Sequence, residues 1–167
     1  MASGTVAALA QWLGASALSH TIQTHAWVIP TLQTVHILCV ALVFSSVILV
    51  DLRALRLLQR DASLEEVARR FLPAVLPLVL VLLATGILLI IGEPKRSLLN
   101  ETFYLKLALI GLSLVLTAAL RRAFSRGFLE EGARWQRAGQ LVAGLSMLAW
   151  CGVLFAGRWI AYTQVDG

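Results

Sequence analysis

Four long apolar runs dominate the chain, and each is long enough to cross a lipid bilayer as a helix. A helix needs about 20 apolar residues to cross the ~30 Å hydrocarbon core of a membrane. The predicted spans cover residues 27–50, 71–91, 102–120 and 138–162, with short charged segments between them. Runs of this length and spacing predict an all-α, polytopic membrane four-helix bundle that occupies residues 1–167 as a single transmembrane domain.

The composition agrees with a membrane protein and argues against a nucleic-acid partner. The chain is 59% hydrophobic and 14% charged, whereas a soluble domain of 167 residues would need a more polar surface. Its net charge of +5 and its pI near 10 could indicate nucleic-acid binding. The basic residues lie between the apolar runs, however, where membrane topology and anionic lipid headgroups account for them. The predicted partner is therefore the lipid bilayer.

The positions of the basic residues predict how the chain is oriented in the membrane. Of the 14 Lys and Arg residues, five fall within residues 51–70 and five within residues 121–137. Loops on the cytoplasmic side carry an excess of Lys and Arg. Both basic loops are therefore predicted to be cytoplasmic, which places both termini on the periplasmic side of a bacterial inner membrane.

Two further patterns concern the N-terminal segment and the helix contacts. Apolar residues recur at helical spacing through residues 5–20, next to Trp12, and predict an amphipathic helix on the membrane surface. Pro77 predicts a kink near the start of the second span. Small residues four apart, such as Gly152 and Ala156, predict close helix contacts, either within the chain or in a homo-oligomer or larger membrane complex.

Three ionisable side chains lie inside the predicted spans, where each costs about 2.5–3.5 kcal/mol at the helix centre. At a rise of ~1.5 Å per residue, His36 lies roughly 13 Å below the outer boundary, and Lys106 and Arg158 about 6 Å below it. Taken singly, either cation could snorkel to the interface, and His36 could bond a neighbouring hydroxyl or carbonyl within the core. Taken together, they predict one cavity in the outer half of the bundle.

The chemistry of this predicted cavity suits an amphipathic redox ligand. In haem b, iron would take an imidazole and the propionates would take cations. His36 is then the metal ligand, and Met147 or a second protomer would supply another. A quinone headgroup is the alternative ligand, and no cofactor at all is the third. The predicted cofactor-binding residues are Gln33, His36, Lys106, Met147, Trp150, Arg158 and Tyr162. Copper at His20 and His25 is a weaker alternative.

These features predict an electron-transfer protein or subunit, with two alternatives. The first alternative is a non-enzymatic structural or assembly subunit, in which His36, Lys106 and Arg158 form a buried polar network. The second is a small transporter or channel, which the lack of paired broken helices disfavours. The sequence contains no P-loop, dinucleotide-binding or zinc-binding motif, so nothing in it indicates hydrolysis or nucleotide chemistry.

Several short motifs resemble those of an uncharacterised family of bacterial four-helix inner-membrane proteins. The resemblance rests on His36 and its neighbours, on Asp51-Leu52-Arg53, on Lys106, and on Gly157-Arg158-Trp159-Ile160-Ala161-Tyr162. It covers nearly all of the chain and implies four transmembrane helices, without implying an activity. There is a looser likeness to cytochrome b561-type proteins and to copper-resistance membrane proteins. This chain departs from the b561 pattern, because it has no histidine in its second, third and fourth spans.

Overall fold

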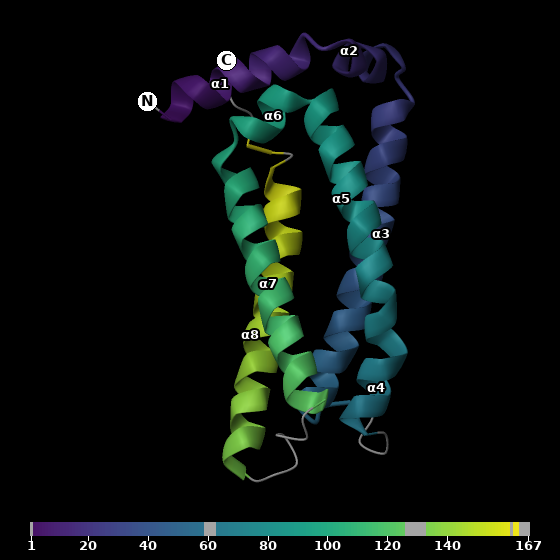
Figure 1. Cartoon of the computed structure of the whole chain (residues 1–167), viewed down its shortest axis with the longest axis vertical. Coiled ribbons are helices and arrows are strands. Elements are labelled where there is room, and N and C mark those ends of the chain that lie inside the picture. Colours follow the sequence, from purple (N-terminus) through teal and green to yellow (C-terminus); the bar gives the residue numbers. More distant parts are fainter. Residues whose placement is uncertain (1, 59–62, 126–132, 161, 164–167) are drawn as a thin grey trace.

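The computed structural model describes residues 2–58, 63–125, 133–160 and 162–163. In this part of the chain every regular element is a helix (Figure 1). In chain order they are α1 (Ala2–Gly14), α2 (Ala17–Thr24), α3 (Val28–Ala54), α4 (Leu64–Phe71), the 3₁₀ turn η1 (Leu72–Ala74), α5 (Val75–Gly92), α6 (Pro94–Leu98), α7 (Glu101–Ser125) and α8 (Ala133–Trp159).

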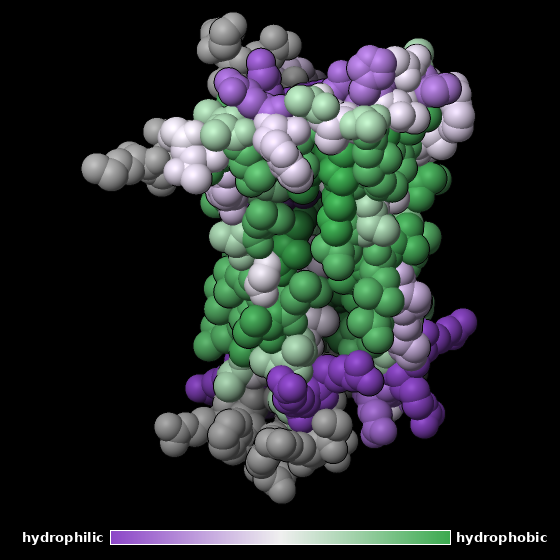
Figure 2. Space-filling model, turned by 45° about the horizontal axis from the view of Figure 1, so that its top comes forward, coloured by the Kyte–Doolittle hydropathy of each residue, from purple (hydrophilic) through white to green (hydrophobic). Residues whose placement is uncertain are grey.

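The predicted all-α four-helix bundle is confirmed. Four helical segments are long and apolar enough to cross a membrane: Val28–Ala54, Glu65–Gly92, Glu101–Ala123 and Gln136–Trp159. Their outward faces form a broad apolar band, with hydrophilic residues gathered towards its two ends (Figure 2). Such a band matches the hydrocarbon region of a bilayer with its polar boundaries. The chain is therefore a membrane protein.

The four long helices form two pairs that pack unequally along their length. α3 packs along α5, and α7 packs along α8, while the main contact between the pairs runs from α3 to α8. Most of the buried core lies towards the end that carries α4, where Val43, Val47 and Val50 of α3 meet Ala143 and Trp150 of α8. We call this end the α4 end and the opposite one the α6 end. Towards the α6 end the pairs lie further apart (Figure 1).

α3 continues to Ala54, past the end that was predicted at residue 50. The last turn closes with a Schellman motif, in which the Leu57 amide donates to the Leu52 carbonyl and the Arg56 amide to the Arg53 carbonyl. Arg56 takes the left-handed conformation that this motif requires, with φ of 61°. The helix therefore ends where its carbonyls find partners, and Asp51 becomes part of the bundle.

The change of helix geometry near Pro77 lies before this proline rather than at it. α4 gives way to the 3₁₀ turn at residues 72–74, and α5 begins at Val75. Pro77 is therefore the third residue of α5, where an amide has no partner within the helix in any case. The structure thus shows a 3₁₀ turn one turn before Pro77, and the kink itself stays a prediction.

The N-terminal segment forms two helices rather than the single surface helix predicted over residues 5–20. Ser16 separates them and caps α2, because its side chain accepts a hydrogen bond from the Ser19 amide at 3.2 Å. Both helices lie across the α6 end (Figure 1). Ala10 packs inward while Trp12 is 70% exposed, as expected of a helix at a membrane surface.

Gly92 allows α2 to sit closely on the end of α5. A Cβ atom at residue 92 would come within 2.9 Å of Ile22 Cγ2, and the Gln23 side-chain amide donates to the Gly92 carbonyl at 2.9 Å. We expect Gly92→Ala to lower the stability by about 1–3 kcal/mol through overpacking, because the β-branched Ile22 has little freedom to move. Thermal unfolding in detergent measures this.

Gly144→Ala is the matched control for this change. A Cβ atom at Gly144 would meet nothing within 4 Å, and the residue lies inside α8. Because Ala favours a helix over Gly, we expect an unchanged or slightly higher melting temperature. Equal losses in both variants would contradict the close approach of Ile22.

Candidate functional site

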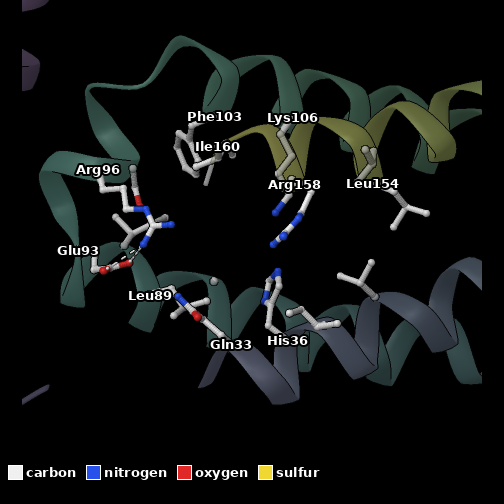
Figure 3. A pocket seen from close by; sticks show the side chains of 17 residues that line it. Gln33, His36, Leu89, Glu93, Arg96, Phe103, Lys106, Leu154, Arg158 and Ile160 are labelled. Carbon is white, nitrogen blue, oxygen red and sulfur yellow. Dashed lines mark hydrogen bonds and ion pairs between the residues drawn. The ribbon is translucent and has the colours of Figure 1, made fainter. Parts of the chain in front are cut away.

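A cavity of about 430 Å³ lies between the helix pairs towards the α6 end. All four long helices contribute to its wall, together with Arg96 and Ser97 of α6. Most of the wall is apolar, and the polar groups come from a small number of side chains (Figure 3). Ile37 lines the cavity and is 65% exposed, so this residue of the wall also faces the surroundings of the bundle. The cavity therefore borders the apolar band at Ile37.

His36 projects from α3 into this cavity with a defined tautomer. Its Nδ1 lies 2.8 Å from the Thr85 hydroxyl of α5, and that hydroxyl donates its own proton to the Val81 carbonyl at 2.8 Å. With the hydroxyl proton on this carbonyl, the Thr85 oxygen accepts from His36, and the imidazole is assigned its proton on Nδ1. Nε2 is then left with its lone pair, and the ring points towards Lys106 and Arg158 (Figure 3).

Lys106 reaches the cavity from α7 by crossing a glycine of α8. A Cβ atom at Gly157 would lie 3.5 Å from Lys106 Cε and 3.6 Å from its Nζ, which is ordinary van der Waals contact, so the end of the lysine side chain packs directly on this glycine. The Lys106 ammonium points towards His36 (Figure 3). Among the described residues no hydrogen bond or ion pair of Lys106 is observed. Its three donor protons are therefore available to a ligand.

Arg158 lies beside Lys106 and contacts Tyr162 one turn further on. Its guanidinium donates to the Tyr162 hydroxyl at 2.8 Å and lies 5.1 Å from the centre of the ring. Tyr162 does not line the cavity and is 65% exposed. It therefore acts on the cavity through Arg158, whose remaining donors point inward (Figure 3).

The other predicted residues are divided between the cavity and the core. Gln33 lines the cavity one turn from His36. Trp150 is 5% exposed in the core and donates to the Thr117 hydroxyl at 3.3 Å, and neither it nor Met147 lines the cavity. The predicted cavity residues that the structure brings together are therefore Gln33, His36, Lys106 and Arg158.

An ion pair at the cavity mouth was missed from the sequence. Glu93 Oε2 and Arg96 Nη1 lie 3.0 Å apart, and both residues line the cavity. Pro94 begins α6 directly after Glu93, so Arg96 falls three residues on, where side chains on a helical turn meet. That i,i+3 spacing was the available signal. With this pair mutually neutralised, Lys106 and Arg158 give the cavity two excess positive charges.

The three histidines do not come together. His20 and His25 are exposed on α2 and at its end, and His25 Nδ1 lies 2.9 Å from the Thr21 carbonyl. Across the described ranges, no group of three or more His, Cys, Asp or Glu side chains could hold a metal ion. Among the residues that line the cavity, His36 alone offers an imidazole.

Comparisons with known proteins identify a family. No curated protein and no solved structure matches the chain. A sequence profile does match it over residues 9–163, which include the second part of α1, all of α2 and all four spans. The chain therefore belongs to DUF6644, a family of unknown function.

Proposed function

We propose that this protein binds a membrane quinone in the cavity at the α6 end. Its role would be electron transfer, either on its own or as a subunit of a larger membrane complex. The observation that carries the proposal is the facing arrangement of His36, Lys106 and Arg158 over apolar walls (Figure 3). A quinone has an apolar body and two carbonyl oxygens, which accept hydrogen bonds. Lys106 and Arg158 supply donors for one oxygen, and the lone pair of His36 Nε2 accepts from the hydroxyl of the reduced form.

The border of the cavity with the apolar band supports a ligand that arrives through the bilayer. The exposed Ile37 lies about 13 Å along α3 from its start, at a depth where lipid tails surround the bundle. A long apolar tail can leave the cavity there without contacting water. Ligand pockets of about 300–1,000 Å³ hold small molecules, so the observed volume accommodates a ring headgroup.

Haem b is the second candidate, and the tautomer of His36 favours it. The hydrogen bond to Thr85 fixes the ring and leaves Nε2 for iron, which is how metal-binding imidazoles are held. Lys106 and Arg158 would bind the propionates. Met147, the predicted second ligand, does not line the cavity, so haem would be held by His36 alone within this chain.

The test is to purify the protein in mild detergent, extract it, and identify quinones by chromatography. We expect quinone in the wild type and a 10- to 100-fold weaker binding of added quinone by Lys106→Met, because a charge-assisted hydrogen bond contributes about 1.5–3 kcal/mol. Lys95→Met is the control, since Lys95 is exposed and does not line the cavity. It should bind as the wild type does.

A visible spectrum of the same sample separates the candidates. A Soret band that His36→Ala abolishes would replace quinone with haem b. A colourless protein that neither retains nor binds quinone would contradict both proposals. That result would favour the structural-subunit alternative.

A further inference from the structure

A second polar site lies at the α4 end, far from the cavity. Asp51 is in the last turns of α3, about 22 Å from His36 along the helix axis. It is fully buried, and neither of its carboxylate oxygens has a hydrogen-bond partner. Its neighbours along α3 in the core are Val47, Val50 and Ala54. A carboxyl group is therefore enclosed by apolar side chains in a membrane-spanning segment.

Ser146 of α8 faces this carboxyl group and is equally isolated. Ser146 is fully buried, and its hydroxyl has no hydrogen-bond partner. Its hydroxyl lies near the Asp51 carboxyl group across the α3–α8 contact, although the two groups are not aligned as a hydrogen bond. Two unsatisfied polar side chains thus lie next to each other, and a proton on the carboxyl group would allow a hydrogen bond from the acid to the Ser146 oxygen.

The charged groups on the elements packed around Asp51 point to the exterior. α4 turns Val67 and Ala68 inward, and α7 turns Leu120 inward. Where the structure describes their side chains, the charged residues of α4, α7 and α8 near this end are exposed: Glu65, Glu66, Arg69, Arg70, Arg121, Arg122 and Arg137. Arg53, two residues from Asp51 on α3, points to another side of the helix and has contacts of its own.

We propose that Asp51 is a proton-binding site. The carboxyl group keeps a bound proton and, after a small side-chain rotation, donates a hydrogen bond to the Ser146 hydroxyl oxygen. An ionised carboxylate without a partner in an apolar interior costs several kcal/mol, whereas the neutral acid needs one hydrogen bond. This site stands apart from the quinone proposal, because no residue of the cavity takes part in it.

Infrared spectroscopy of the full chain in nanodiscs near neutral pH tests this site. We expect a carboxylic-acid C=O band that shifts on carboxyl-¹³C labelling of aspartate, is lost in Asp51→Asn and persists in Asp61→Asn. Ser146→Ala should move the band to higher frequency, because the acid loses its hydrogen-bond acceptor. If Asp51→Asn does not fold, the labelled double variant Asp61→Asn/Asp166→Asn retains Asp51 as its only aspartate and assigns the band.

Three outcomes would overturn the proposal. The first is a labelled protein that shows carboxylate bands alone near neutral pH. The second is an acid band that survives Asp51→Asn. The third is an acid band that added Na⁺ converts to carboxylate, which would make Asp51 a metal-cation site.

Discussion

Trp150→Ala is expected to lower the free energy of unfolding by about 3 kcal/mol, the largest effect we predict for one side chain. Trp150 is 5% exposed, lies in the core where α8 meets α3, and donates to Thr117. The expected loss is at the low end for a buried tryptophan, because lipid already solvates apolar surface and the cost comes from lost contacts and a cavity. Thermal or denaturant unfolding in detergent measures it.

Trp159→Ala is the matched control on the same helix. Trp159 is 62% exposed, so its truncation should change stability by at most about 0.5 kcal/mol. Trp150→Phe keeps most of the ring and removes the indole donor, and it should lose only about 1 kcal/mol for the bond to Thr117. Equal effects of the Trp150 and Trp159 truncations would contradict a core centred on the α3–α8 contact.

Asn100→Ala is expected to destabilise the α6 end by about 2–3 kcal/mol, through a lost helix cap and lost hydrogen bonds. Asn100 is 3% exposed, and its carbonyl oxygen accepts from the Thr102 amide at the start of α7. Its side-chain amide donates to the Thr163 carbonyl at 3.0 Å and to the Thr163 hydroxyl at 2.8 Å. One side chain therefore joins the start of α7 to the residues that follow α8.

Asn100→Asp separates these two roles. The carboxylate still accepts from the Thr102 amide but cannot donate to Thr163, so we expect the cap to remain and the link to α8 to be lost. Hydrogen exchange should then stay slow at Thr102 and become faster near Thr163. Fast exchange at Thr102 in both variants would show that the cap depends on the link.

The spans could be predicted from the sequence because the thickness of a bilayer sets the length of each apolar run. The helix ends could not, because they depend on local hydrogen bonds. α3 was predicted to stop at its first charge, whereas the Schellman motif at Arg56 sets its end. For the second span, the sequence predicts a kink at Pro77, whereas the 3₁₀ turn that the structure shows one turn earlier was not predicted.

For the site, depth was informative for the three ionisable residues. It placed His36, Lys106 and Arg158 in the outer half of their spans, and the structure brings them around one cavity. Trp150 was predicted as a further cofactor-binding residue and Met147 as a second iron ligand. They lie about 12 and 16 Å deeper than Arg158 along α8, where the helix pairs converge and side chains fill the interior. Arg96 was missed because its loop was not expected to fold over the mouth.

The uneven core has a mechanical consequence for the bundle. Tight packing holds the two helix pairs together at the α4 end. At the α6 end the cavity separates the pairs, so fewer side-chain contacts resist a change in their spacing. Thermal fluctuations should then be widest at the α6 end, with local opening far below the global unfolding energy. A molecule bound in the cavity would then set the distance between the two helix pairs at the α6 end.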